Sequence, residues 1–456
     1  MLRSGSIQLS KNSRPRLRTF SVAGLLTFSI QGTFAASFIL LASIANANLP
    51  APASVLEIEA STGLIAPASS RPPLPRGTPV LADLQDLKTL GIPVYAQDLS
   101  NQVGLAFTTE HQQAQIQHLS HEKGKCGGFE VLPVSQDPEV HLQQLRSLHQ
   151  VTRRMNAVAR GPWRRIEIRK QDWIESALGQ VQDLSLHETV TWLSSFKNRN
   201  EKSATPNEHI VQLKAKIDEL IRQRSFPVQV ELVAHSNTRQ QSLRVRIPGR
   251  LRPSEIVVLG GHHDSVNSSW SGRDHAPGAD DNASGSANLL EILRVLLQQP
   301  QPERTLEIFW YAAEESGLLG SAEIAKSYRQ QKADVIGVLQ LDMTSYPGSG
   351  EMTIANITDF THPWMQQLLK ELNATYVGLN VVDDSCGYGC SDHASWYRQG
   401  YPTVVPFEAR TRNMNPNIHS KNDTITPALN FRHSAAIAKL SLAWALELAN
   451  STLRAP

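Results

Sequence analysis

Acidic and histidine side chains gather in the second half of this sequence, next to apolar runs or helix starts. The runs EIVVLGG, TLEIFWYAA and VIGVLQL each end just before such side chains, ADDNASG precedes a long helical pattern, and NPNIHSKNDT is loop-like. Six candidates for chemistry stand at these places: His262, Asp281, Glu314, Glu315, Asp342 and His419. Each alone has an ordinary explanation, such as a helix cap or a surface residue. Together, so many carboxylates would repel one another unless cations were present, which predicts a metal centre.

The ligand types indicate the metal. Imidazole and carboxylate without thiolate suit zinc in an open, catalytic site, although they do not distinguish zinc from cobalt or manganese. Two histidines and three acids are enough for two metals with one bridging carboxylate, so we expect two Zn²⁺ ions per chain. Asp264 is placed to accept a hydrogen bond from the ring of His262. Side chains of adjacent residues point in different directions, so one of Glu314 and Glu315 can bind metal while the other acts as general base.

The elements around these residues predict an α/β domain. Apolar strand patterns alternate with amphipathic helices from about Asp183 onward. We expect strands at 242–249, 255–261, 305–313, 334–343 and 401–408, and helices at 187–198, 207–225, 284–300, 317–331 and 433–451. Such alternation predicts a largely parallel sheet covered on both faces. Ligands in these folds collect outside the carboxyl ends of the strands, where most of the six candidates fall.

The amino-terminal residues predict export. A basic start is followed by a largely apolar stretch from Phe20 to Ile44, which ends in the small-x-small pattern Ala45-Asn46-Ala47. The alternative is a membrane anchor, because the stretch is long enough to span a bilayer. Polar residues interrupt it, so we expect a signal peptide over 1–47, a secreted protein, and no stable membrane insertion after cleavage.

The next segment predicts a pro-region over 48–170. It opens with a Pro-rich stretch from Leu49 to Leu81, suited to an extended linker. A modest globular segment follows, with strand-like pieces IPVYA and FEVLPV, and a basic patch over 153–170 suggests a protease-sensitive connection. The catalytic domain would then be 171–456. A formal net charge of +2, with no long basic stripe, argues against nucleic acid as a partner.

Six strings in this order define a family resemblance: GGHHDS, APGADDNASG, YAAEESGLLGS, LQLDMTSY, CGYGCSDHASW and NPNIHSKNDT. The stretch from about Asp183 to Ser451 closely resembles the bacterial leucyl aminopeptidases, which are secreted co-catalytic two-zinc exopeptidases. The resemblance implies a zinc exopeptidase-like fold: a three-layer α/β/α sandwich with a central, mostly parallel mixed sheet, preceded here by a small pro-region. The string HEKGKCGGFE is similar to a motif in the family's amino-terminal extensions, so Cys126 would leave with the pro-region.

The resemblance also implies roles for single residues. His262 and Asp342 would bind one zinc, Glu315 and His419 the other, and Asp281 would bridge them.

Further residues take roles by the same resemblance. Glu314 would be the general base, and Tyr388 would donate a hydrogen bond to the polarised carbonyl or its tetrahedral intermediate. A Cys386–Cys390 disulfide would shape the loop that carries Tyr388. The apolar pocket for the first substrate side chain would be formed by the disulfide loop together with Met343, Ile357, Phe407, Thr411, Met414 and Ile418.

The predicted function is zinc-dependent removal of amino-terminal residues, preferably large and hydrophobic ones such as leucine, from peptides with a free amino terminus. We expect a monomer. Three alternatives remain at this point: glutaminyl cyclisation, deacylation of N-acyl amino acids on the same fold, and a non-catalytic binding ectodomain.

Overall fold

The computed structural model describes residues 56–57, 73–123, 128–159, 166, 168–222, 224, 226–267 and 273–455. The predicted signal peptide, most of the Pro-rich stretch, Cys126, and Arg160, Arg164 and Arg165 of the basic connection lie outside these residues. None of the helices within the described ranges has both the length and the apolar character needed to cross a membrane.

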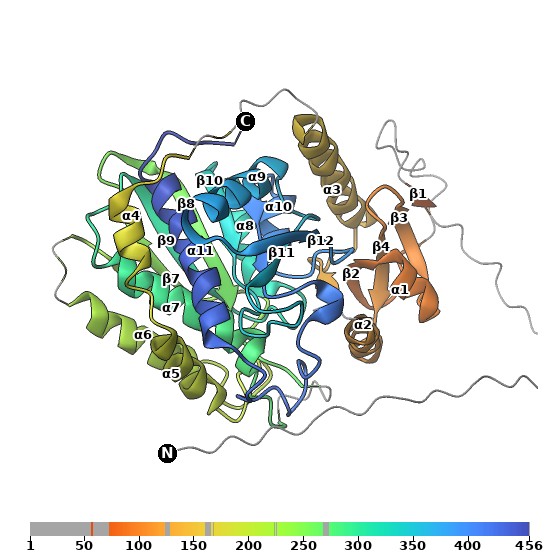
Figure 1. Ribbon diagram of the computed structural model, residues 1–456. Helices are drawn as coiled ribbons and strands as arrows, with labels where there is room; N and C mark the ends of the chain where they lie inside the picture. Colours follow the sequence, from red (N-terminus) through yellow and green to blue (C-terminus); the bar gives the residue numbers. More distant parts are fainter. Residues whose placement is uncertain are drawn as a thin grey trace, which may run out of the picture. The chain divides into compact units, whose positions relative to one another are not determined.

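A six-stranded mixed sheet carries the candidate site (Figure 1). Its strands, in the spatial order β13-β10-β8-β9-β7-β6, are β6 (Gln229–Val233), β7 (Ser242–Ile247), β8 (Arg252–His262), β9 (Arg304–Tyr311), β10 (Asp334–Gln340) and β13 (Thr403–Val404). β13, β10, β8 and β9 pair in parallel, while β7 and β6 join antiparallel at one side. The prediction of a mostly parallel mixed sheet is therefore confirmed.

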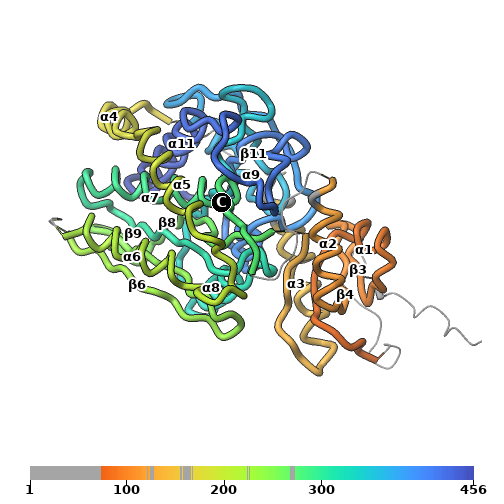
Figure 2. The backbone as a smooth tube through the Cα atoms, turned by 90° about the horizontal axis from the view of Figure 1, so that it is seen from below, coloured from red at the N-terminus to blue at the C-terminus, as the bar shows by residue number. Residues whose placement is uncertain are grey.

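Helices cover both faces of this sheet, as the alternation of strand residues requires. Val257 and Leu259 of β8 belong to the core on one face, and Ile256 and Val258 to the core on the other. Figure 2 shows β8 and β9 between α5, α7 and α11 on one side and α8 on the other. The helices of this part of the chain are α4 (Asp172–Leu178), α5 (Asp183–Ser194), α6 (Glu208–Ile221), α7 (Gly285–Leu296), α8 (Leu319–Gln330), α9 (Pro363–Leu372), α10 (His393–Arg398) and α11 (Phe431–Ala449).

A small second sheet lies in the chain after β10. It consists of β11 (Thr353–Ile357), β12 (Asn380–Asp384) and β14 (Pro406–Phe407) in the order β12-β11-β14. The single strand expected at 401–408 is therefore divided, with β13 in the large sheet and β14 in the small one. Val405, between them, is buried among the apolar residues beside the small sheet.

The segment before residue 160 forms an α/β unit of its own sheet and helices. Its sheet has the order β1-β3-β4-β2-β5, with β1 (Leu56–Glu57), β2 (Thr78–Asp83), β3 (Val94–Asp98), β4 (Val103–Thr108) and β5 (Phe129–Val131). Its helices are α1 (Leu84–Thr89), α2 (Glu110–Glu122) and α3 (Pro138–Ala159). The strand-like pieces noted in the sequence fall in β3 and β5. The expected boundary at residue 170 stays a prediction.

Candidate metal centre

The parallel strands bring the candidate ligands to one edge of the sheet. His262 ends β8, Glu314 and Glu315 follow β9, and Asp342 follows β10, so all lie at carboxyl ends of neighbouring strands. Asp281 precedes α7, and His419 comes from the loop before α11. Two groups of possible metal ligands result, each with its ligand atoms within 4.8 Å of one another: His262, Asp281 and Asp342, and Asp281, Glu315 and His419.

Asp281 belongs to both groups and turns one carboxylate oxygen toward each. Its Oδ1 lies 3.1 Å from Nε2 of His262, and its Oδ2 lies 3.0 Å from Nε2 of His419. His262 Nε2 is also 3.4 Å from Oδ1 of Asp342, and His419 Nε2 is 3.2 Å from Oε2 of Glu315. A single ring nitrogen facing two carboxylates cannot bind both with one proton, whereas a cation among the three atoms can.

The donor set fits zinc. All six candidates, including Glu314, are at most 6% exposed. Oε2 of Glu314 and Oε1 of Glu315 are buried and accept no hydrogen bond from the residues that the structure describes. Buried carboxylates without partners are costly unless a positive charge compensates them. Nitrogen and oxygen donors at this density are the ligands of an open zinc site.

The pKa values of these groups reveal the same deficit of positive charge. Burial lowers the pKa of His262, but the charges of Asp342 and Glu314 outweigh it and place the pKa well above its usual value. Burial likewise lowers the pKa of His419, and Glu315 and Asp281 raise it well above the usual value. Burial raises the pKa of Glu315 to about 7, against the opposing charge of His419. The carboxylates thus attract protons where metal cations would otherwise compensate them.

Two further carboxylates hold the backbone of the ligands. Asp264 lies 3.3 Å from Nδ1 of His262 and also accepts hydrogen bonds from the backbone N–H of Glu314 and Glu315, at 3.1 and 3.2 Å. Asp423 does the same for the segment that contains Asp281, accepting from the N–H of Asp280 and Asp281 at 3.0 Å each. Asp264 therefore connects the ends of β8 and β9, a wider role than the sequence indicated, and Asp423 was not predicted.

A buried arginine, also not predicted, orders the loops between the ligands. Arg199 is 1% exposed and donates to the backbone carbonyls of Leu193, His263, Pro277 and Gly278. Burial lowers its pKa to about 10, so it remains a cation at neutral pH. Its four carbonyl acceptors lie as far as 85 positions apart in the sequence, so no local sequence pattern indicates the role of Arg199.

Residues of the string DNASG other than Asp281 also pack against the ends of the strands. Asn282 donates to the carbonyls of His262 and Leu341, and its Oδ1 accepts from the N–H of Gly285. A Cβ on Gly285 would lie 2.5 Å from the Leu341 oxygen, so only glycine permits this approach. The motif thereby fixes Asp281 between the ends of β8 and β10.

Glu314 lies beside the centre without belonging to either ligand group. Burial raises its pKa well above the usual value, and the charges of Glu315 and Asp392 act in the same direction while His262 opposes them. A buried carboxylate that readily accepts a proton is suited to general-base chemistry.

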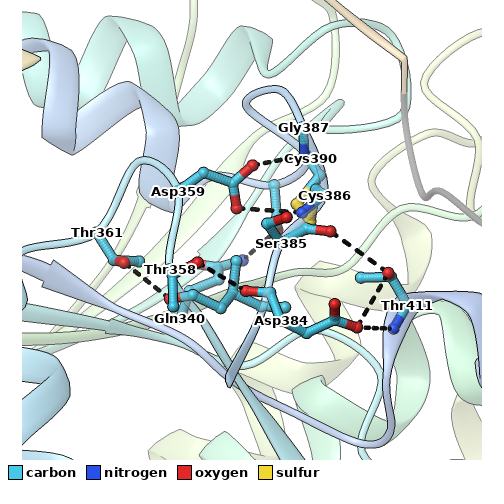
Figure 3. Close-up of a disulfide and its surroundings, with 12 residues drawn as sticks. Gln340, Thr358, Asp359, Thr361, Asp384, Ser385, Cys386, Gly387, Cys390 and Thr411 are labelled. Atoms are coloured by element: carbon cyan, nitrogen blue, oxygen red, sulfur yellow. Dashed lines mark hydrogen bonds between the residues drawn. A yellow bond between two sulfur atoms is a disulfide. The ribbon is translucent and has the colours of Figure 1, made fainter. Parts of the chain in front are cut away.

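The disulfide loop is held by the carboxylate of Asp359 (Figure 3). The structure contains the Cys386–Cys390 disulfide that the resemblance implied. Asp359 accepts hydrogen bonds from the N–H groups of Cys386 and Gly387, at 3.1 and 2.6 Å. Tyr388, in the loop closed by this disulfide, is buried among apolar side chains.

One buried apolar cluster contains five of the six residues expected to line the substrate pocket. Met343, Ile357, Phe407, Met414 and Ile418 pack together with both disulfide cysteines. Thr411, the one polar member of the expected set, donates its hydroxyl to Asp384 and to the carbonyl of Ser385, and its N–H to Asp384 (Figure 3).

A parallel sheet that gathers buried histidines and carboxylates at its carboxyl edge, with a further carboxylate beside them, defines a metal-dependent α/β hydrolase. Among known protein families, the model of Peptidase family M28 matches residues 243–445. With the relatives below, this shows that the chain belongs to peptidase family M28.

The relatives include fungal enzymes and solved bacterial structures. Leucine aminopeptidase 1 of Coccidioides posadasii is 36% identical over 300 residues, covering 63% of this chain and 76% of its own. Leucine aminopeptidase 1 of Aspergillus niger is 36% identical over 278 residues, covering 58% of this chain and 70% of its own. The crystal structure of the Legionella pneumophila LapA aminopeptidase superposes with a TM-score of 0.69 at 25% identity, covering 83% of this chain and 100% of its own. The crystal structure of LapB from the same organism superposes with a TM-score of 0.68 at 26% identity, covering 82% of this chain and 100% of its own.

These findings bear on the sequence predictions in two ways. The predicted metallo-aminopeptidase and the α/β fold are confirmed, and the family implies zinc. The match to LapA also extends before the expected catalytic domain, because residues 171–456 (286 of 456, about 63% of the chain) fall short of the 83% covered.

The shared position of Asp281 predicts how zinc is lost. Replacing Asp281 by Ala should reduce bound zinc well below that of His419→Ala, because the first variant removes a ligand from both groups and the second from one. Zinc per folded chain, measured by atomic emission after gel filtration, checks this. Equal zinc content in the two variants would contradict a bridging role.

Proposed function

We propose that this chain is a secreted aminopeptidase of the leucyl aminopeptidase type that uses two zinc ions to remove large hydrophobic amino-terminal residues from peptides. The supporting observation is the carboxylate of Asp281, whose two oxygens face histidines of two different ligand groups. One metal site would not need both oxygens turned to separate imidazoles. A paired site would, with Asp281 as the bridge.

The chemistry follows from what surrounds this pair. Zinc in such a site lowers the pKa of a bound water and polarises the scissile carbonyl. Glu314 accepts a proton from the attacking water and returns it to the leaving amine, which its raised pKa favours. Tyr388 donates a hydrogen bond to the carbonyl oxygen as negative charge develops there. The substrate's free amine is attracted by the carboxylates of the centre.

Substrate preference rests on the apolar cluster beside the disulfide loop. Burying a leucine-sized side chain there contributes about 1.5–3 kcal/mol relative to leaving it exposed. Met414 is flexible enough to adapt to leucine, methionine or phenylalanine. Thr411 directs its hydroxyl to Asp384 and not to this cluster, so it imposes little polarity on the pocket.

The route to the site of action is part of the same proposal. The export signal over 1–47 brings the chain to an oxidising compartment, which suits the Cys386–Cys390 disulfide. Residues 48–170 form a pro-region and 171–456 the catalytic domain, acting as a monomer. The motifs of the chain closely resemble those of the bacterial leucyl aminopeptidases.

Hydrolysis of leucine p-nitroanilide tests the function directly. Activity should disappear with a chelator and return with zinc, because the carboxylates and imidazoles of the centre need the metal to bind and activate water. The same assay on N-acetyl-leucine p-nitroanilide is the control and should stay negative. Activity on the blocked substrate alone would favour a deacylase, and inactivity on every free-amine substrate with zinc bound would favour a cyclase or a binding domain.

Glu314→Gln should keep its zinc and lower kcat by about a hundredfold to ten-thousandfold, since the amide cannot accept the proton. Stopped assays at saturating substrate and zinc analysis of the same sample measure both quantities. Glu351→Gln, an exposed residue away from the centre, is the matched control and should retain full activity. A zinc-loaded Glu314→Gln variant with normal turnover would rule out this residue as the base.

A further inference from the structure

The amino-terminal unit, residues 73–159, contacts the segment that carries Glu314 and Glu315. Gln117 of α2 is 5% exposed and donates its Nε2 to the backbone oxygen of Glu315 at 2.6 Å. Two residues further along this segment, the carbonyl of Gly317 accepts a hydrogen bond from the N–H of Val131 at 3.1 Å. Both contacts engage the backbone of the segment and leave the Glu315 carboxylate directed to the metal centre.

Gly317 is adapted to this approach. Its φ is +103°, which favours glycine, and a Cβ there would lie 2.7 Å from Cγ2 and 2.9 Å from the backbone nitrogen of Val131. A side chain at position 317 would therefore push β5 away. The catalytic part of the chain is shaped to receive this strand three residues after Glu314.

A second contact reaches the disulfide loop. Glu130 lies between Phe129 and Val131, which both adjoin Gly317. It forms an ion pair with Arg398, the last residue of α10, and the two side chains are only 8% and 9% exposed. The Arg398 guanidinium lies 5.1 Å from the ring centroid of Phe360. A Cβ on Gly389 would lie 2.8 Å from Nη2 of Arg398, so the guanidinium lies against the residue after Tyr388.

A common apolar core joins the same surfaces. One buried cluster contains residues of the amino-terminal unit together with Leu318, Phe360, Ala394 and Tyr397 of the catalytic part. The residues from the amino-terminal side are Leu81, Tyr95, Ala96, Val103, Leu105, Leu132, Leu142, Leu145 and Leu148. Separating the two parts would expose this core and leave a buried arginine without its partner, both of which oppose release.

The contacts described above do not involve the candidate ligand atoms themselves. Among the described residues, none from 73–159 belongs to the two metal-ligand groups or to the apolar cluster beside the disulfide. The contacts of this unit are therefore with segments next to the candidate ligands and the disulfide loop.

We propose that the amino-terminal unit is a positioning element of the enzyme, which stays bound after cleavage of the connecting segment and holds the Glu314–Gly317 segment and the Tyr388 loop through β5 and Gln117. This inference rests on the proposed function. Glu130, Arg398 and Gln117 act through the segments they hold and do not touch substrate.

The first test is retention. A site-specific protease sequence replaces residues 160–165 in the full chain, and the cut protein is passed over gel filtration at physiological salt. The two fragments should elute together, with zinc, and the complex should hydrolyse leucine p-nitroanilide. Separation of the fragments, with kcat of the larger one equal to or above that of the complex, would overturn the proposal.

The second test is positioning, with Glu130→Gln in the cut complex. The variant should show faster amide exchange over 314–318 and 386–390, and a kcat lower by about tenfold to a hundredfold at unchanged KM and zinc content. The charge-reversed pair Glu130→Arg with Arg398→Glu should recover part of the loss. If the variant compromises folding, Gln117→Leu, which removes one hydrogen bond, should accelerate exchange over 314–318 in a folded protein.

Glu139→Gln is the matched control, because it removes an ion pair with Arg146 inside the same unit. Unchanged exchange and kcat in Glu130→Gln and Gln117→Leu, or equal changes in Glu139→Gln, would overturn the positioning role. A zinc-loaded but inactive wild-type complex would instead contradict the aminopeptidase function, while retention and amide exchange would still decide the docking.

Discussion

The burial of four carboxylates beside two imidazoles is the constraint on which this structure depends. Asp281, Glu314, Glu315 and Asp342 are each 2% exposed, and their full ionisation would place four negative charges in a region with little water. Two divalent cations would supply four positive charges and so balance them. Without such cations, the pKa values of His262, His419 and Glu315 are all raised, so these groups bind protons more readily than usual. The surrounding fold holds these groups together against their repulsion.

The fold does so in part with buried side chains that bond to the backbone. Asp264 and Asp423 each accept two adjacent N–H groups, and thereby hold the backbone of Glu314–Glu315 and of Asp280–Asp281 in place. Arg199 satisfies carbonyls of the loops between them. Because each of these side chains is itself buried, removing one would leave unpaired backbone atoms beside the centre. The loops therefore keep their shape through mutually dependent contacts.

Much of this could be predicted from the sequence, because the signals are local. Apolar runs ending in acids or histidines placed His262, Glu314, Glu315 and Asp342 at strand ends, and helical periodicity identified α7 and α11. Other features depend on distant contacts. Asp423 and Arg199 act on backbone atoms far away in sequence, and a short string around either gives no sign of it. Thr411 stays a predicted pocket residue, and the hydrogen bond from its hydroxyl to Asp384 depends on a residue 27 positions away. β11 and β12, of five residues each, are too short for a periodic pattern.

Anomalous diffraction at the zinc edge, from crystals of the full chain grown with zinc, tests the central claim most directly. The account predicts two peaks that share Asp281 as a ligand, one beside His262 and Asp342 and the other beside Glu315 and His419. A single peak, or peaks away from Asp281, would contradict a paired centre built on its carboxylate.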